Sequence, residues 1–505
     1  MASSPTQRHY RAPCPGCGAP VEFRSAQSTH AVCAYCHSTV VRHGEVLERI
    51  GKMAELFDDH SPLQLLATGR AALDGAPQPF TLIGRLQYKG PAGTWTEWNA
   101  AFDDGRQATL GEDNGAYVLS QPVTVAGGPL GDPAASGGPD LAQLHLGQTL
   151  TVAGKSYSVA AHLQACLIAA EGELPRLPAL GALFTVVELR SADGEVLSID
   201  AGQQPPQWAR GRAVALEDLQ LQGLKEASVK EEKSRQFSCP HCGAPVQVQL
   251  DRSQSVTCPA CHSLIDLRSG IGGALRHALQ DEPVQPLIPL GSTGRLQGVD
   301  WQVVGFQHRM GVSPGDDEHF GWSEYLLYHR QQGFAFLVDA EDGWSLVRPT
   351  TGAPALSRDG QSATYLGTRY TLQYSYQAET DFVLGEFYWP VERGQTTRNR
   401  DFASAKGLLS REETPGEVTW SSGDRLRSDA VAQAFPLPED KNRLQRDDPG
   451  PFVAASGVGM ATVVLIVVAL IVLVIVLSQL SGTSGGGLRS SSGSYGGYSS
   501  GGSHK

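Results

Sequence analysis

Short runs of alternating hydrophobic and polar residues recur along this chain. Runs such as EYLLYHR, which begins at Glu324, and RYTLQYSY, which begins at Arg369, are rich in aromatic and β-branched residues. Turn pairs such as Asp-Gly and Gly-Gly separate them. Alternation between turns predicts β-strands. Strands repeated every eight to twelve residues or so are typical of antiparallel sandwiches and barrels. The pattern therefore predicts a mainly β protein whose larger domains are antiparallel β-sandwiches or open barrels.

Few segments favour helix. The clearest helical candidates are residues 45–57, EVLERIGKMAELF, and residues 270–280, GIGGALRHALQ. Between them, residues 216–236 are charged, and Glu226 and Lys230 have the spacing of an i,i+4 pair. This spacing predicts a helical linker.

A long apolar run lies near the end of the chain. Residues 453–477 carry no charge. As a helix they would extend about 37 Å, which exceeds the ~30 Å hydrocarbon core of a bilayer. The run predicts one C-terminal transmembrane helix. Residues 481–505, which are rich in Gly and Ser, predict a disordered tail.

Basic residues on the two sides of this run predict its orientation. Lys441, Arg443 and Arg446 precede it, whereas only Arg489 and Lys505 follow. Positive charge near a membrane span favours the cytoplasmic side. The chain also opens without the apolar core of a secretory signal. We expect a single-pass protein of the bacterial inner membrane with its N-terminal part in the cytoplasm.

Two cysteine-rich stretches of similar sequence lie 225 residues apart, CPGCGAPVEFRSAQSTHAVCAYCHS and CPHCGAPVQVQLDRSQSVTCPACHS. In each, fifteen residues separate two Cys-x-x-Cys pairs. Zinc prefers four soft ligands in a tetrahedron, and two facing Cys-x-x-Cys turns supply them. In a reducing compartment such pairs indicate metal rather than disulfides. The spacing predicts two structural zinc ions held in two zinc ribbons. The predicted ligands are Cys14, Cys17, Cys33, Cys36, Cys239, Cys242, Cys258 and Cys261.

Other interpretations of the cysteines are weaker. A redox site would need one Cys-x-x-Cys at a helix start, and catalytic zinc would keep an open coordination position that four cysteines close. His37 and His262 directly follow the last cysteine of each stretch and are expected to be solvent-facing neighbours. Cys166 lies alone in an apolar run and is expected to be a small buried hydrophobe.

The repetition extends beyond the cysteines. Thr-Gly-Arg recurs at residues 68 and 293, and WTEW at Trp95 is similar to WSEY at Trp322. GEVLSIDAG at Gly194 is similar to GEVTWSSG at Gly416. Order along the chain is kept, so the sequence predicts a tandem duplication in which each unit is a ribbon followed by a β-domain. The predicted organisation is ribbon 1 at 10–45, a divergent β-domain at 60–220, a charged linker at 221–236, ribbon 2 at 237–270, a second β-domain at 285–438, the span at 453–477 and the tail at 481–505.

No catalytic constellation stands out, and we expect no enzyme. Two pairs of glutamates recur, Glu97 with Glu324 and Glu173 with Glu386. Carboxylates can serve acid–base chemistry, but they also close turns by accepting hydrogen bonds from backbone amides. We favour the structural role. Recurring aromatic residues such as Trp322 could line a groove, but packing in the core is the expected role.

The net charge of −12 disfavours a general nucleic-acid coat, because phosphate binding requires a dense positive surface. Neither cysteine stretch is strongly basic. A nucleic-acid-binding membrane protein is therefore a secondary hypothesis, and an enzyme that uses the recurring glutamates is a third. No nucleic-acid partner is expected.

Taken together, the motifs resemble the bacterial family called domain of unknown function 4178. The resemblance is clearest over residues 237–436. There the family pattern is matched by Trp322, Ser323, Glu324, Tyr325, Gly385, Glu386, Phe387 and Trp389. In the first unit it is matched by Trp95, Glu97, Trp98, Gly172 and Glu173, whereas Leu174 and Pro175 depart from the aromatic ending.

The resemblance implies a membrane-linked accessory role, since genes of this family are similar in setting to stress-related and polyamine-related clusters. With the motifs, it predicts a membrane-anchored, cytosol-facing binding or scaffold protein with two structural zinc ions. Its expected partners are a protein at the membrane and the lipid bilayer itself.

Overall fold

The computed structural model describes most of the chain up to residue 447. The described residues are 10–43, 46–53, 61–91, 93–113, 116–123, 141–202, 206–225, 235–250, 253–267, 277–280, 284–314, 319–329, 332–341, 343–415, 417–437 and 441–447. The predicted span at 453–477, the tail at 481–505 and most of the linker at 221–236 lie outside them. Among the described residues, no helix has the length and apolar character needed to cross a membrane.

The second β-domain is a ring of eight antiparallel strands, called barrel 2 here. Their order is β22-β23-β24-β25-β31-β30-β29-β28, and β28 pairs again with β22. The bounds are β22 Val299–Val312, β23 His319–His329, β24 Gly333–Ala340, β25 Gly343–Pro349, β28 Thr368–Phe387, β29 Thr396–Ser404, β30 Gly407–Glu413 and β31 Val418–Leu426.

The first β-domain, called barrel 1, repeats the same ring as β7-β8-β9-β10-β15-β14-β13-β12, with β12 pairing again with β7. The bounds are β7 Gln78–Lys89, β8 Thr94–Phe102, β9 Gln107–Asp113, β10 Ala116–Pro122, β12 Lys155–Leu174, β13 Leu183–Arg190, β14 Glu195–Asp200 and β15 Gln207–Val214. A mainly β fold with two related domains is confirmed. The rings are closed rather than open, because the 20-residue strands β12 and β28 are long enough to pair with a neighbour on each side.

Each cysteine stretch forms one separate two-stranded sheet, β1-β2 or β16-β17, and further strands that join the sheet of a barrel. Ribbon 1 (residues 10–53) contains β1 Tyr10–Pro13, β2 Pro20–Phe23, β3 His30–Val32, β4 Ser38–His43 and β5 Val46–Lys52. Ribbon 2 (residues 235–267) contains β16 Arg235–Ser238, β17 Pro245–Val248, β18 Ser255–Thr257 and β19 Leu264–Asp266. Strand β3 pairs with the end of β12, and β18 pairs with the end of β28. Each ribbon therefore continues the sheet of its own barrel.

Both predicted helices next to the ribbons are wrong where the structure describes them. Residues 46–52 form β5, which pairs with β4, and His277–Ala278 form β20, which pairs with β19. Pairing with a neighbouring strand outweighs the helical pattern, as tertiary contacts often do for short segments. Helix is limited to α1 (Ser428–Ala434) and the 3-10 turns η1 Leu141–Gln143, η2 Glu217–Leu219 and η3 Lys441–Leu444 within the described residues.

The outer face of barrel 2 is covered by the end of the described chain. Val431 and Phe435, at helix α1, and Leu444 of η3 pack with Trp301 and Trp344 in one buried cluster. The Trp344 indole donates a hydrogen bond to the Leu444 carbonyl at 2.8 Å, and Arg446 makes a two-pronged ion pair with Asp339. This segment is therefore anchored on β24 and β25.

Short strands complete each unit: β6 Thr68–Ala71 and β11 Thr149–Val152 in the first, and β21 Thr293–Leu296, β26 Ala355–Leu356 and β27 Ser362–Tyr365 in the second. The two Thr-Gly-Arg motifs lie at equivalent places, in β6 and β21, as the repeat predicted. The pairing of Gly194 with Gly416 was wrong. It would equate β14 with β31, whereas the ring order makes β14 the counterpart of β30.

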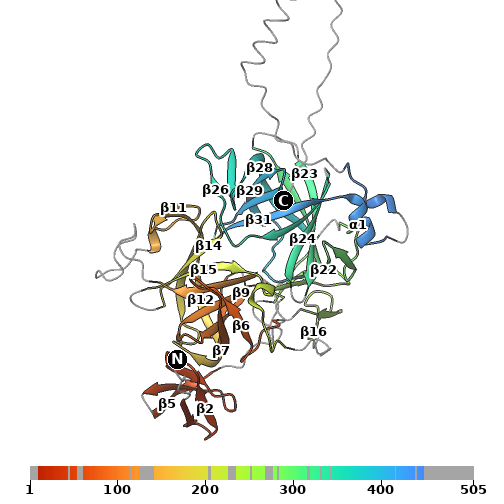
Figure 1. Cartoon of the computed structure of the whole chain (residues 1–505). Helices are drawn as coiled ribbons and strands as arrows, with labels where there is room; N and C mark the ends of the chain where they lie inside the picture. Colours follow the sequence, from red (N-terminus) through yellow and green to blue (C-terminus); the bar gives the residue numbers. More distant parts are fainter. Residues whose placement is uncertain are drawn as a thin grey trace, which may run out of the picture.

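The two barrels lie side by side, and ribbon 1 projects from the lower end of barrel 1 in the view shown (Figure 1). An isolated bridge joins Ala161 of β12 to Glu417, just before β31. Backbone amides of Ala353 and Leu366 donate to the carbonyls of Ser191 and Ala192 across the same contact. The units are therefore joined through backbone hydrogen bonds.

Candidate metal centres and barrel interiors

Each cysteine pair lies on a tight turn whose backbone places the sulfurs. The Gly18 amide donates to the Cys14 carbonyl at 2.8 Å, and the His37 amide donates to the Cys33 carbonyl at 2.9 Å. Gly18 and His37 have positive φ angles of 78° and 56°, and Gly243 and His262 repeat them at 75° and 57°. Glycine adopts this conformation without penalty, so the glycine after the first pair has a clear role. The histidines occupy the same left-handed position in the second turn.

The four sulfurs of each ribbon converge. In ribbon 1, Cys14 Sγ lies 3.7 Å from Cys36 Sγ, and Cys17 Sγ lies 3.7 Å from Cys33 Sγ. Ribbon 2 repeats both distances. All four ligand atoms in each set lie within 4.8 Å of one another. A tetrahedral zinc site with bonds of about 2.3 Å has S···S edges of about 3.8 Å. Each ribbon therefore has a four-cysteine cluster that fits a metal ion such as zinc.

A serine beside each cluster was not singled out from the sequence. Ser38 and Ser263 are buried, and their hydroxyls lie 3.1 Å from the sulfurs of Cys36 and Cys261. The hydrogen bond between the Cys36 sulfur and the Ser38 hydroxyl lowers the pKa of the Cys36 thiol to about 6. A lower pKa favours the thiolate, which is the form that binds metal. The signal was present in the sequence as the tripeptide Cys-His-Ser, which ends both stretches.

The other candidate ligands stay outside the clusters. His37 and His262 are half-buried and do not belong to either four-cysteine set. Cys166 lies on β12, far along the chain from both ribbons, and is half-buried rather than fully buried. No role in metal binding follows for these three residues.

Glu173 and Glu386 fasten the ribbons to the barrels. Glu173 Oε2 accepts hydrogen bonds from the amides of Arg24 and Ser25 at 2.6 and 3.1 Å. Glu386 accepts hydrogen bonds from the amides of Gln249 and Leu250 at 2.7 and 2.9 Å, and a third bond from the Ser253 hydroxyl. These contacts agree with the structural role expected of the carboxylates. Burial raises the pKa of Glu173, although the two amides act to lower it.

The glycine before each of these glutamates is required by close packing. Gly172 and Gly385 have φ angles of 73° and 87°. A Cβ at either position would lie 2.3 Å from a backbone carbonyl of the neighbouring strand, that of Ile83 or Val304. The recurring Gly-Glu pair thus marks the point where β12 and β28 cross β7 and β22 while reaching the ribbon.

The second glutamate pair faces the interior of the rings, where the two barrels differ. In barrel 2, Glu324 is buried and accepts hydrogen bonds from the Trp322 indole at 2.6 Å and from the Gln307 amide at 2.5 Å. In barrel 1, Glu97 accepts a longer bond of 3.3 Å from the Trp95 indole. Burial raises the pKa of Glu97, and the nearby Arg176 acts to lower it.

A buried polar cluster crosses the inside of barrel 2. Arg309 on β22 donates to Thr397 Oγ1 on β29 at 2.6 Å and to Glu412 Oε2 on β30 at 3.1 Å. These strands are not neighbours of β22 in the sheet, so the contacts cross the interior. Tyr376 donates to Asp401 at 2.8 Å. The barrel 2 cluster comprises Arg309, Glu324, Tyr376, Thr397, Asn399, Asp401, Ser410 and Glu412.

Four interior positions of barrel 1 carry hydrophobic or aromatic side chains where barrel 2 carries polar ones. The strand registers show which positions are equivalent. Tyr88 of barrel 1 lies opposite Trp95 and Leu167 on its two neighbouring strands. Arg309 of barrel 2 lies opposite Trp322 and Thr380 in the same way. By the same registers, Leu86, Tyr88, Phe184 and Val186 replace Gln307, Arg309, Thr397 and Asn399. These four residues belong to one hydrophobic cluster of barrel 1. Other equivalent positions stay polar in both barrels, because Glu97, Ser198 and Asp200 match Glu324, Ser410 and Glu412. The interiors therefore differ chiefly at the four replaced positions.

Aromatic residues mostly pack in the core, as expected. Trp98, Tyr325 and Trp344 are buried. Trp322 is also buried, yet it faces the barrel 2 cluster, and the Arg309 guanidinium lies 5.5 Å from its ring centre. This contact fits a cation–π interaction inside the barrel.

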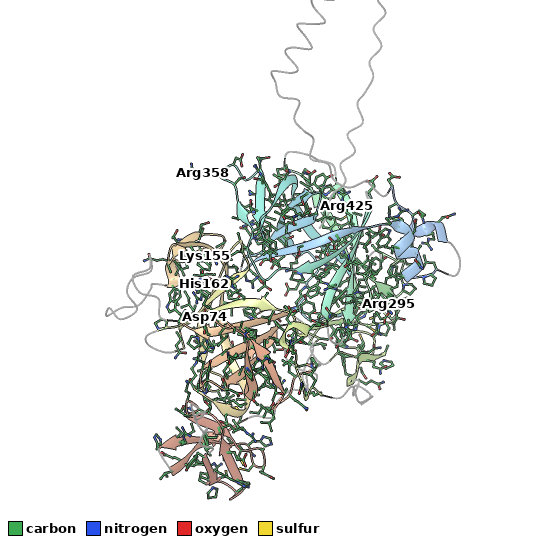
Figure 2. All side chains as sticks on the ribbon, in the orientation of Figure 1. Asp74, Lys155, His162, Arg295, Arg358 and Arg425 are labelled. Atoms are coloured by element: carbon green, nitrogen blue, oxygen red, sulfur yellow. The ribbon has the colours of Figure 1, made fainter. Side chains whose placement is uncertain are left out.

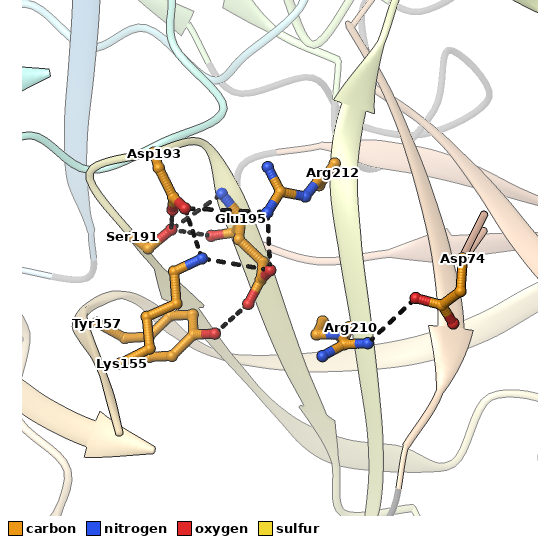
Figure 3. A network of polar contacts seen from close by, with 8 residues as sticks. All are labelled: Asp74, Lys155, Tyr157, Ser191, Asp193, Glu195, Arg210 and Arg212. Atoms are coloured by element: carbon orange, nitrogen blue, oxygen red, sulfur yellow. Dashed lines mark hydrogen bonds and ion pairs between the residues drawn. The ribbon is translucent and has the colours of Figure 1, made fainter. Parts of the chain in front are cut away.

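Barrel 1 carries a separate charged network at the hairpin between β13 and β14 (Figure 3). Lys155 Nζ lies 2.6 Å from Asp193 and 3.3 Å from Glu195, and Arg212 lies 3.2 Å from Glu195. The Tyr157 hydroxyl also donates to Glu195. Burial acts to raise the pKa of Asp193, but hydrogen bonds from Lys155 and Ser191 lower it to about 2. Positive and negative charges balance in this network.

The outer surfaces of both barrels carry scattered charge, and Arg295 and Arg358 lie on the outside of barrel 2 (Figure 2). Arg295 is paired with Asp300 at 3.8 Å.

Comparison with known proteins identifies the barrels. No curated protein and no solved structure matches the chain at a significant level. Residues 74–216 and 289–428 match the family described as "Domain of unknown function (DUF4178)". Each match spans all eight strands of one barrel and leaves the ribbons out, so the family domain is the barrel itself. Because the two matches cover more than half of its residues, the chain belongs to the DUF4178 family, with two tandem copies of the family domain.

Proposed function

We propose that this protein is a membrane-attached binding protein without catalytic activity, in which two zinc-stapled units present their barrels to the cytoplasm of a bacterium. The observation that carries the proposal is that both units use the same recurring cysteines and glutamates for structure. Eight cysteines form two closed clusters, and Glu173 and Glu386 are occupied by ribbon amides. These residues would otherwise be the first candidates for catalysis.

Zinc would act as a staple in each ribbon. The buried residues of ribbon 2 outside the cysteines are few, and include Val246, Val248 and Ile265. A core of this size cannot stabilise a small sheet alone, so bound metal supplies the missing free energy. Four thiolates leave no open position at the ion, which favours a structural role over a catalytic one.

The ribbons would then hold the ends of the long strands. Strand β28 spans barrel 2 and continues to β18, where Glu386 accepts three hydrogen bonds. A ribbon without its metal would lose the backbone that presents these donors. Zinc in this scheme supports the shape of the barrel and of whatever surface the barrel offers to a partner.

Membrane attachment rests on residues 453–477. Five residues separate this run from Asp447, the last described residue. An extended chain of that length reaches roughly 20 Å. Because Arg446 is tied to Asp339, attachment would hold the α1 and η3 face of barrel 2 close to the bilayer. The partners in this proposal are the lipid bilayer and a protein at the membrane.

Native mass spectrometry of the gently purified full chain tests the zinc part. We expect two zinc ions per chain, and loss of both on treatment with a strong chelator at low pH. A folded protein that carries no metal would contradict the proposal.

Membrane fractionation tests the second part. The full chain is compared with a chain truncated after Asp447, which keeps the Arg446–Asp339 ion pair and the covered outer face of barrel 2. We expect the full chain in the membrane fraction after a high-salt wash and the truncated chain in the supernatant. Equal distribution of the two would contradict membrane attachment and leave the zinc result unaffected.

A further inference from the structure

The interior of barrel 2 contains buried polar atoms whose bonding capacity is not used. Arg309 is 2% exposed and Ser410 is 4% exposed. Neither Arg309 Nε nor Ser410 Oγ has a hydrogen-bond partner. A buried polar atom without a partner destabilises the folded state, and most such atoms in native proteins are satisfied by protein, water or ligand. These two atoms could therefore form hydrogen bonds with a polar molecule inside the ring.

The rest of the cluster supplies the complementary groups. Glu324, Asp401 and Glu412 carry carboxylate oxygens, each of which can accept more than one hydrogen bond, and Arg309 Nε and the Ser410 hydroxyl are donors. The structure thus places donors and acceptors around one interior. A ligand with hydroxyl groups can use both, because each hydroxyl donates one hydrogen bond and accepts others.

Charge in this interior is mixed. Arg309 pairs with Glu412 and lies 3.8 Å from Glu324, and Arg425 is placed opposite the buried Ser345 on the neighbouring strand. Cations and anions therefore oppose one another along the cluster. A ligand with a full charge would disturb existing ion pairs in a medium of low polarity, whereas an uncharged ligand would leave them intact.

The carboxylates do not converge on a metal ion. Among the described residues, only the two cysteine sets bring three or more ligand atoms within 4.8 Å of one another. Aromatic rings instead line one side of the interior, where Trp322 and Tyr376 meet edge to face at 5.6 Å. Flat apolar surfaces beside polar groups suit a molecule that has both hydroxyl edges and a C–H face.

We propose that the interior of barrel 2 binds a small uncharged polyhydroxylated molecule, such as a sugar or a cyclic polyol. Glu412, whose side chain is 21% exposed, is the member of the cluster that reaches solvent, so entry is from its side. The site deepens the binding role proposed above, but it depends on neither zinc content nor membrane attachment. Barrel 1 differs at this site, because Tyr88, Phe184 and Val186 replace Arg309, Thr397 and Asn399.

The test measures binding of three probes of similar size to the purified full chain. D-glucose is uncharged, D-glucosamine is a cation and D-gluconate is an anion at neutral pH. Isothermal titration calorimetry and ligand-observed NMR are run at probe concentrations up to 20 mM, with myo-inositol as a second uncharged probe. We expect an uncharged probe to bind at least tenfold more tightly than either charged probe.

Two variants locate the site. Ser410→Ala removes a hydroxyl that makes no hydrogen bond in the protein, so the variant should fold normally. Arg309→Lys keeps a positive charge but removes Nε. We expect each to weaken binding of the uncharged probe five- to tenfold or more. Ser198→Ala, at the position of barrel 1 equivalent to Ser410, is the matched control and should leave binding unchanged.

Absence of binding by both uncharged probes, equal binding of D-glucose, D-glucosamine and D-gluconate, or equal losses in the Ser198 and Ser410 variants would overturn the inference. None of these results would alter the metal count or the membrane fraction, so a failure here is distinguishable from a failure of the proposed function. Thermal unfolding of each variant without ligand confirms that folding is intact.

Discussion

The two barrels of this protein share strand order, register shifts and docked ribbons, yet their interiors differ in chemistry at several matched positions. In barrel 1, Leu86, Tyr88, Phe184 and Val186 pack together as an apolar filling. In barrel 2, the matching positions carry Gln307, Arg309, Thr397 and Asn399. A closed ring therefore forms with either interior. The two copies share the pairing of their strands and the packing of their outer faces. They differ in the side chains inside the ring.

A charge that both interiors retain is neutralised from different places. Asp200 of barrel 1 occupies the position of Glu412 in barrel 2, since they pair with Val186 and Asn399 respectively. Glu412 is bound by Arg309 on β22, whereas Asp200 is bound by Arg176, which follows β12. The acidic residue is thus common to the two copies and its cationic partner is not. A function that needs Arg309 can reside in barrel 2 alone.

The largest effect is expected at the part that the units share. Cys33→Ser and Cys258→Ser each remove one ligand from equivalent clusters. Structural zinc contributes about 10–16 kcal/mol to the folding of small zinc domains, so each change should release one metal ion and unfold its own ribbon. Native mass spectrometry counts the ions, and hydrogen exchange maps the affected residues. Loss of both ions from one substitution would show that the units are not independent.

The next largest effect compares one interior position of barrel 2 with its equivalent in barrel 1. Arg309→Met should lower the free energy of unfolding by about 3–5 kcal/mol, because it leaves buried carboxylates without their partner. Tyr88→Phe, at the equivalent position of barrel 1, should change it by about 1 kcal/mol or less. Urea denaturation of the truncated chain measures both. Arg295→Met, which affects an exposed pair, is the surface control. Similar losses for Arg309 and Tyr88 would contradict the contrast.

The ribbon contacts provide a third comparison. Glu386→Ala removes three hydrogen bonds and Glu173→Ala removes two. Each buried donor left unsatisfied costs about 1–3 kcal/mol, so we expect losses of roughly 2–4 kcal/mol, with the larger loss in the second unit. Faster exchange of the Leu250 and Ser25 amides would report detachment directly. Unchanged exchange in both variants would mean that strand pairing alone holds the ribbons.

The recurring interior glutamates should respond with opposite signs. Glu324→Gln weakens the hydrogen bonds that residue 324 accepts from Trp322 and Gln307. It should lower the free energy of unfolding by about 1–2 kcal/mol. Burial raises the pKa of Glu97, so ionised Glu97 lowers folded stability once the pH exceeds its unfolded value. Glu97→Gln should therefore raise stability slightly at pH 7, and the gain should vanish at pH 4. A loss in both variants would show that Glu97 is as well satisfied as Glu324.

The smallest effect concerns the charged hairpin of barrel 1, which has no acidic counterpart in residues 404–407 of barrel 2. The pKa of Asp193 is about 2 in the folded chain, below its ordinary value of 3.8. Ionised Asp193 contributes its full stabilisation above pH 3.8, and this contribution is lost as the pH falls to about 2. Because the group is half exposed, Asp193→Asn should cost less than about 1 kcal/mol at pH 7, and less again at pH 3. A constant difference between pH 7 and pH 3 would exclude the ionic contribution.

The sequence by itself determined the local and repeated features of this protein. Alternation between turns predicted strands, and the doubled cysteine spacing predicted four sulfurs per cluster, because both depend on residues close together in the chain. The matched WTEW and WSEY motifs placed equivalent strands correctly. The Gly-Glu pairs indicated carboxylates bound to backbone amides, although not which amides.

Only the tertiary structure decided what depends on distant pairing. Residues 45–57 have a helical pattern, but β4 lies beside residues 46–52 and converts them to a strand. Closure of each ring depends on β12 meeting β7 and on β28 meeting β22, which no local signal specifies. The same holds for the barrel 2 cluster. Thr397 lies 88 positions from Arg309 along the chain, and Glu412 lies 103 positions from it. The three residues become neighbours only when the ring closes. A hydrophobic pattern reports which side of a strand is buried, but not which side chains it will meet there.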